Sequence, residues 1–88
     1  MMRLMIVIVR DGDADNVSQA LVNAGYRVTR MASTGGFLRR GNTTLMVGVE
    51  ESKEGGIYAL LQEACSPPDS DQHRATVFAL DITHYEQL

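Results

Sequence analysis

The sequence predicts an α+β fold, in which a four-stranded antiparallel sheet carries two helices on one of its faces. Four segments have the apolar, β-branched character of strands, and two have apolar residues at the i, i+3, i+4, i+7 spacing of a helix. Their order along the chain is β-α-β-β-α-β. Two split βαβ halves in this order form a ferredoxin-like βαββαβ sandwich. With 88 residues, the chain is expected to form a single domain over positions 1–88.

The first half of the chain is predicted to contain a strand, a helix and a second strand. Leu4 to Val9 is continuously apolar, as expected of a strand that is buried on both faces. The helical period that follows has Asp13 as a candidate N-cap and Gly25 as its stop. Tyr26 to Ala32 has the alternation of a strand, in which Arg27 and Thr29 share one face and Tyr26 and Val28 share the other.

The second half repeats this pattern. Thr43 to Val49 is predicted to be a strand, and Ser52 is placed to cap a second helix. Pro67 and its polar neighbours predict an irregular segment, because proline lacks the backbone donor that a helix needs. Ala75 to Ile82 is the last predicted strand, and the final six residues form at most one turn of helix.

The last strand carries apolar side chains on both faces. Val77 and Ala79 share one face, whereas Phe78, Leu80 and Ile82 share the other. Since the two helices cover only one face of the sheet, we expect another subunit to cover the second.

Composition narrows the classes of function. A net charge of −3 argues against a protein that coats DNA or RNA through a basic face. With one cysteine the chain has no intrachain disulfide and no thiol set for zinc. The N-terminal apolar run of six residues is too short for a signal peptide or a membrane span. We expect a cytoplasmic protein that does not insert into membranes.

The segment from Ser33 to Asn42 is ten residues long, where two to five are usual between paired strands. Its glycines resemble a phosphate-binding loop in their spacing. That motif requires a lysine where this chain has Asn42, and it opens a helix where this chain predicts a strand. A Walker-type site is therefore excluded.

The residue types around this loop leave two interpretations open. Consecutive glycines can form an anion-binding concavity, Arg27 can meet a phosphate, and Asn42 offers the donor and acceptor that an adenine edge requires. Arg39 and Arg40 add charge, and Thr29, Thr34 and Thr43 add hydroxyls. In the alternative, the loop is a solvated tip whose side chains bind nothing.

A longer motif includes this loop. "YRVTRMASTGGFLRRGNTTLMVGVE" resembles the signature of the cyclic-di-AMP receptor family of PII-like signalling proteins. "LMIVIVRDGDADNVSQALVNAGYRVT" is similar to the first strand and helix of that family, and "ATVFALDITHYEQL" to its last strand. The resemblance covers about three quarters of the chain.

The resemblance implies a homotrimer of ferredoxin-like subunits that binds its ligand in the clefts between them. Arg27 and Thr29 match positions that line the ribose-phosphate of the ligand, and Asn42 matches a side chain that hydrogen-bonds an adenine. Gly48 matches a position where the backbone approaches the ligand closely. Gly36, Phe37 and Leu38 match loop positions whose backbone surrounds the ligand. The predicted ligand-binding residues are thus Arg27, Thr29, Thr34, Gly36, Phe37, Leu38, Asn42 and Gly48.

One part of the chain departs from the family pattern. The long glycine- and proline-rich excursion before the last strand is reduced here to "CSPPDSDQHRATVF", with His73 and Arg74 in place of two glycines. Arg74 could replace lost phosphate contacts, although a solvated charge is the expected reading. Two alternatives to cyclic di-AMP therefore stay open: a mononucleotide such as AMP or ATP in the same cleft, or an interaction trimer without a ligand.

No enzyme, cofactor or metal site is predicted. The carboxylates of Asp11, Asp13 and Asp15 match the first positions of a calcium loop, but Asn16 and Val22 occupy the positions that need glycine and glutamate. The same aspartates would repel the substrate of an acylphosphatase-like enzyme. The expected role is nucleotide-dependent signalling, in which the 33–42 loop becomes ordered and is recognised by a protein partner that the sequence does not identify.

Overall fold

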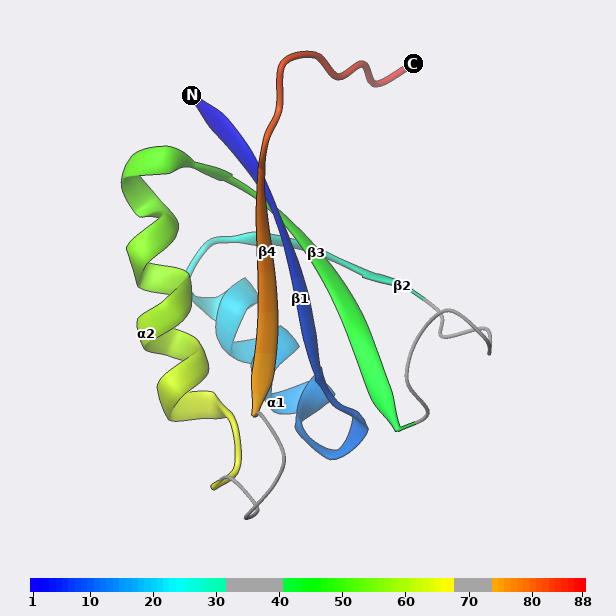
Figure 1. The fold of residues 1–88 in the computed structure, drawn as a ribbon, viewed down its shortest axis with the longest axis vertical. Coiled ribbons are helices and arrows are strands. Elements are labelled where there is room, and N and C mark those ends of the chain that lie inside the picture. Colours follow the sequence, from blue (N-terminus) through cyan, green and yellow to red (C-terminus); the bar gives the residue numbers. More distant parts are fainter. Residues whose placement is uncertain (32–40, 68–73) are drawn as a thin grey trace.

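The computed structural model describes residues 1–31, 41–67 and 74–88, and it confirms the predicted order of elements. The chain forms a twisted sheet with two helices packed against it (Figure 1). The elements are β1 (Met2–Arg10), α1 (Asp11–Asn23), β2 (Arg27–Met31), β3 (Asn42–Glu50), a 3₁₀ turn (Glu51–Lys53), α2 (Glu54–Ala64) and β4 (Ala75–Asp81).

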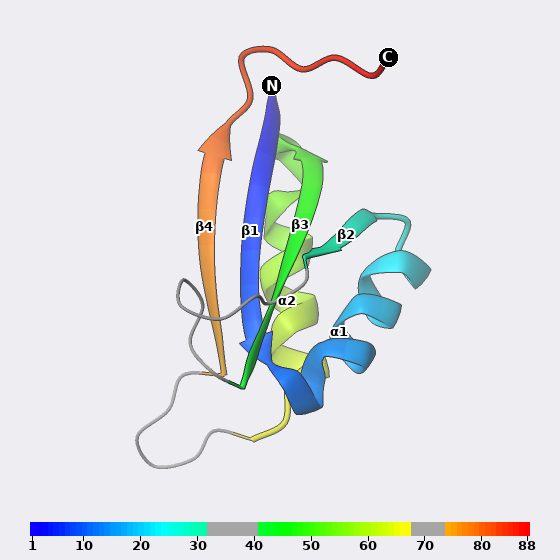
Figure 2. The same cartoon turned by 90° about the vertical axis from the view of Figure 1, so that its right-hand side faces the viewer.

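The four strands form one antiparallel sheet in the order β2-β3-β1-β4. Both helices lie on the same side of it, and no described helix lies on the other side (Figure 2). This is the predicted α+β sandwich, with β2 and β4 as its edges. No helix in the described parts of the chain is long and apolar enough to cross a membrane.

The core lies between the sheet and the helices. Alternate residues of β1 and β3 point into it, because successive side chains of a strand lie on opposite faces. The largest fully buried side chains are Met5, Val7, Val9, Val17, Leu21, Leu45, Val47 and Ile57. Each contributes about 1.5–3 kcal/mol by leaving water.

The prediction that β1 is buried on both faces is wrong for the single chain. Met5, Val7 and Val9 are fully buried, but Leu4, Ile6 and their neighbours on the outer face are only half-buried. The strand is apolar on both faces, although only one of its faces packs against the helices.

The predicted helix caps are also corrected. Asp13 is not an N-cap, since β1 runs directly into α1 and the cap position falls on Arg10, without a side-chain cap bond. Ser52 lies in the 3₁₀ turn before α2 and does not cap it either. There the backbone N–H of Glu54 bonds to the carbonyl of Glu51, so a backbone turn replaces the side-chain cap.

Other boundaries agree more closely. Gly25 ends α1 as predicted, with a φ of +93° that favours glycine. The second strand spans Arg27–Met31, slightly less than predicted, and Ala32 lies outside the described residues. The residues after β4 contain no helical turn.

The single thiol, Cys65, is buried at the end of α2 and 7% exposed. Burial raises its pKa, and the neighbouring carboxylate of Asp13 raises it further. We expect a thiol-specific reagent at pH 8 to label the native protein about 10-fold or more slowly than the urea-unfolded chain. Equal rates would contradict the burial of Cys65.

The same shift predicts a pH dependence of stability. Because the pKa of the Cys65 thiol is raised on folding, the unfolded chain loses this proton first. The free energy of unfolding is therefore expected to fall as the pH rises above the ordinary thiol pKa of about 8.5. Urea titrations at pH 7 and pH 9.5 measure this, and Cys65→Ala, which lacks the titrating group, should show a smaller fall.

Candidate functional site

The face of the sheet opposite the helices carries the candidate site. Arg27 of β2 pairs with Gly48 of β3, and Thr29 pairs with Met46. All four lie on the face opposite Val28 and Val47, whose side chains belong to the core. Arg27, Thr29 and Gly48 are exposed. The structure thus brings three of the predicted ligand residues together at one edge of this outer face.

Asn42 lies on the same face but at the other end of β3. It is the first residue of the strand and pairs with Arg10 of β1. Gly48 lies six positions further along the chain, which corresponds to about 20 Å along a strand. A ligand that contacts both Asn42 and the Arg27–Gly48 pair of the same chain must therefore be elongated along β3.

The remaining predicted residues, Thr34, Gly36, Phe37 and Leu38, lie outside the described residues.

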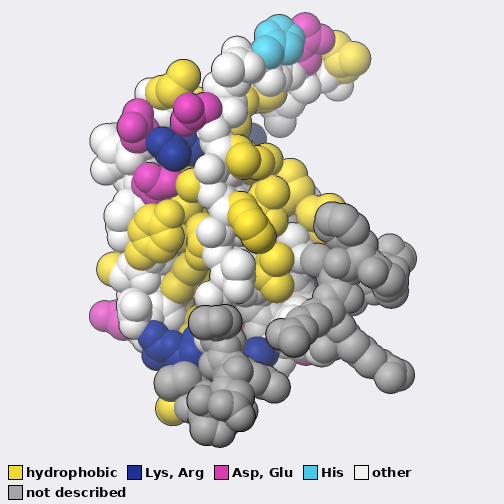
Figure 3. Space-filling model, viewed as in Figure 1, with side chains coloured by type: hydrophobic (Ala, Val, Ile, Leu, Met, Phe, Trp, Pro, Cys, Tyr) yellow, Lys and Arg dark blue, Asp and Glu magenta, His cyan; other side chains and the backbone are white. Residues whose placement is uncertain are grey.

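The centre of the outer face is apolar. Its central rows contain Leu4 and Ile6 of β1, facing Leu80 and Phe78 of β4. Phe78 is 53% exposed and Leu80 is 49% exposed. Figure 3 shows hydrophobic side chains gathered beside β4 and over the neighbouring strands. The polar candidate residues therefore border an uncovered apolar surface.

Thr44 is a candidate that the sequence reasoning missed. It pairs with Ile8 of β1 and Met31 of β2 on the outer face, between Asn42 and Met46 along β3. It is 3% exposed, and its buried hydroxyl has no hydrogen-bond partner among the residues that the structure describes. A buried hydroxyl without a partner costs about 1–3 kcal/mol. The alternation from Asn42 along the strand was the signal that could have identified it.

The base of the candidate loop is held by the first turn of α1. The Thr43 hydroxyl donates to the Asp11 carboxylate at 2.6 Å, and the Asp11 backbone N–H donates to the Gly41 carbonyl at 2.8 Å. Gly41 has a φ of +90°, a conformation in which other residues are strained. Thr43, whose hydroxyl was considered for the ligand, is thus bonded within the chain.

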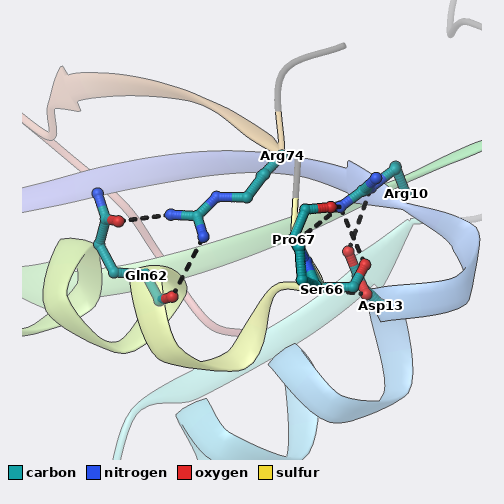
Figure 4. Close-up of polar contacts among 6 residues, drawn as sticks. All are labelled: Arg10, Asp13, Gln62, Ser66, Pro67 and Arg74. Atoms are coloured by element: carbon teal, nitrogen blue, oxygen red, sulfur yellow. Dashed lines mark hydrogen bonds and ion pairs between the residues drawn. The ribbon is translucent and has the colours of Figure 1, made fainter. Parts of the chain in front are cut away.

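A second set of contacts holds the segment after α2 (Figure 4). Arg10 donates to the Ser66 carbonyl at 2.8 Å, to the Ser66 hydroxyl at 2.9 Å and to the Pro67 carbonyl at 3.1 Å. Asp13 is 5% exposed, lies 3.3 Å from the Arg10 Nε, and accepts the Ser66 backbone N–H at 3.2 Å. The residue expected to cap α1 instead joins that helix to a segment 53 positions away.

Arg74 is also engaged within the chain. Its guanidinium donates to the side-chain oxygen and the backbone carbonyl of Gln62 on α2 (Figure 4). The expectation of a solvated charge is wrong, because Arg74 is half-buried and bonded to α2. Its alternative role as a phosphate ligand would require these bonds to be exchanged.

Two hollows among the described residues lie away from these candidates. One, between α1 and β2, is lined by Asp15, Arg30 and neighbouring helix residues, and Arg30 donates to Asp15 at 2.8 Å. The other, between α2 and β4, includes Tyr58, Cys65 and Arg74. Neither includes Arg27, Thr29, Asn42 or Gly48. Among the described residues, no group of three or more His, Cys, Asp or Glu side chains is placed to hold a metal.

The fold and this face define a class: a small ferredoxin-like domain whose sheet carries an arginine, a threonine and an asparagine on the face opposite the helices. The comparisons with known proteins specify the class further. The sequence model of the cyclic-di-AMP receptor family matches residues 2–72. The chain therefore belongs to the cyclic-di-AMP receptor family, which confirms the resemblance found in the sequence.

A solved structure supports the fold over nearly the whole chain. It is the crystal structure of a functionally unknown protein from Pediococcus pentosaceus, with 30% sequence identity and a TM-score of 0.79. The alignment covers 99% of this chain and 97% of that one. Family membership indicates nucleotide-binding, PII-like signalling.

Proposed function

We propose that this protein is a receptor for cyclic di-AMP that binds its ligand in the clefts between the subunits of a homotrimer. Binding orders the 33–42 loop, and the ordered loop is recognised by a partner protein. The observation that carries the proposal is the family match over residues 2–72, which spans both the loop and the strands that flank it.

The chemistry of the outer face fits an anionic ligand at the β2 edge. Arg27 is exposed and always charged, so its guanidinium can form charge-assisted hydrogen bonds to a phosphate. Gly48 lies directly opposite, and a side chain added there would meet only the end of Met2 at 4.0 Å. The absence of a side chain at Gly48 leaves room for a ligand beside Arg27. Thr29 adds a hydroxyl to this edge.

The separation of the candidate residues along β3 fits a ligand that is held between two subunits. Asn42 can pair with an adenine through its adjacent donor and acceptor, but it lies about 20 Å along β3 from Gly48. Because a phosphate and an adenine of one cyclic dinucleotide lie closer together than this span, Arg27 of one subunit and Asn42 of a neighbouring subunit would contact the same ligand. A mononucleotide, AMP or ATP, remains the second candidate, because Arg74 is bonded to Gln62 and the segment before β4 is short.

Two observations support a cleft that a second subunit completes. The outer face exposes large apolar side chains, and a chain of 88 residues buries only about 60–65% of its unfolded surface by itself. In the described parts of the chain, the hollow beside Asp15 and the hollow beside Tyr58 contain none of Arg27, Thr29, Asn42 and Gly48. A homotrimer in which each sheet is covered by its neighbours would remove the apolar surface and add a wall beside Arg27.

Calorimetric titration with cyclic di-AMP, and with cyclic di-GMP, AMP and ATP in parallel, tests this function. We expect saturable binding of cyclic di-AMP near one site per subunit. Arg27→Gln is expected to weaken it by about 10- to 150-fold, as expected when a hydrogen bond to a charged group is lost. The matched control is Arg30→Gln, on the same strand but the opposite face, where Arg30 bonds to Asp15.

The outcomes separate the alternatives. Preference for AMP or ATP would support the same binding site with a mononucleotide as its ligand. No heat with any nucleotide, from folded protein, would reject the receptor function and leave an interaction trimer. If Arg27→Gln and Arg30→Gln bind cyclic di-AMP with equal affinity, the β2 edge is not part of the binding site.

A further inference from the structure

We propose that Asp11 is a positioning residue for the nucleotide site, holding the first residues of β3 so that Asn42 faces the ligand. The inference rests on the proposed function, because it takes Asn42 as the side chain that pairs with adenine. Asp11 itself does not touch the ligand.

Asp11 binds the chain on both sides of Asn42. Its backbone N–H bonds to the carbonyl of Gly41 at 2.8 Å, and its carboxylate accepts the Thr43 hydroxyl at 2.6 Å. Asn42 is the residue between these two contacts. The Thr43 hydroxyl and the Asn42 side chain belong to opposite faces of β3, so the bond to Asp11 fixes the strand without occupying the ligand face.

The position needs such support because the sheet ends there. Asn42 and Arg10 form the last pair of the β1–β3 ladder, and Gly41 already has the positive φ of a turn. The end of a ladder frays unless tertiary contacts hold it. If Asn42 is mobile in the free protein, it must become ordered when the ligand binds. The conformational entropy lost in this step lowers the affinity.

The neighbouring carboxylates have other partners. Asp13 lies against Arg10 and Ser66, and Asp15 accepts a hydrogen bond from Arg30. Only Asp11 among these three aspartates contacts the start of β3 in the described structure. Asp15 is therefore a suitable control: an aspartate of the same helix that is bonded to β2 instead.

Four variants test the role without removing any ligand contact. Asp11→Ala deletes the carboxylate, and Thr43→Val replaces the hydroxyl by a methyl group of similar size. Thr43→Ser restores the hydroxyl, and Asp15→Asn is the control on the same helix. The side-chain amide resonances of Asn42 are recorded by NMR in the ligand-free protein, and affinity for cyclic di-AMP is measured by calorimetry.

We expect Asp11→Ala and Thr43→Val to shift the Asn42 side-chain resonances and to weaken cyclic di-AMP binding by about 3- to 30-fold, the range for one residue that must be ordered on binding. Thr43→Ser and Asp15→Asn should behave like the wild type. In an Asn42→Ala background, Asp11→Ala should cause no further loss of affinity, since its effect passes through Asn42. A general loss of stability would instead weaken binding in both backgrounds.

Unchanged Asn42 resonances in Asp11→Ala would overturn the inference, as would additive losses in the double variant. If the wild type binds no nucleotide, the proposed function fails. The spectra of the ligand-free variants still decide whether Asp11 positions Asn42.

Discussion

Replacement of Asn42 by alanine is expected to weaken the binding of cyclic di-AMP by about 5- to 150-fold. That range corresponds to the roughly 1–3 kcal/mol that a bidentate amide contact to adenine contributes. Asn42 is half-buried at the start of β3, and its side chain makes no hydrogen bond with the other described residues. The free energy of unfolding should therefore change by no more than about 0.5 kcal/mol.

Two further substitutions make this result specific. Asn42→Asp keeps the size and the acceptor but loses the donor, so it should lose affinity for cyclic di-AMP as alanine does. Asn16→Ala changes an exposed asparagine on α1 and should bind like the wild type. An unaltered affinity in Asn42→Ala would exclude this side chain from the site, whichever nucleotide the protein prefers.

The fold could be predicted because each helix and strand is specified by a pattern within its own segment of the sequence. Alternation and helical spacing are present within each segment, and the turn at Gly25 follows from the one residue type that tolerates a φ of +93°. The helix starts could not be predicted. Asp13 has the sequence context of a cap, but its carboxylate meets Arg10 and the amide of Ser66, a contact that only the folded chain creates.

The candidate site divides in the same way. Strand alternation correctly placed Arg27 and Thr29 on one face of β2. The pairing of Arg27 with Gly48 depends on the register of β2 against β3, and the contact of Asp11 with Thr43 on packing across 32 positions. Neither is fixed by any local pattern, so the support of the loop base became visible only in the structure.

Replacement of Phe78 by glutamate is expected to dissociate the proposed trimer. Phe78 is 53% exposed on the outer face, so the single chain tolerates a charge there at a cost of about 0.5 kcal/mol or less. In a trimer closed over this face, each subunit would bury an unpaired carboxylate, which costs several kcal/mol per ion. Light scattering should then give the 9.7 kDa of one chain rather than three times that mass.

Val22→Glu is the matched control for this substitution. Val22 is 51% exposed, almost the same as Phe78, but it lies on α1, on the helical side of the sheet. It should leave both the mass and the affinity for cyclic di-AMP unchanged. Phe78→Glu should lose both together, because a cleft between subunits does not exist in a monomer. A monomeric Phe78→Glu variant that still binds cyclic di-AMP with full affinity would place the whole site within one chain.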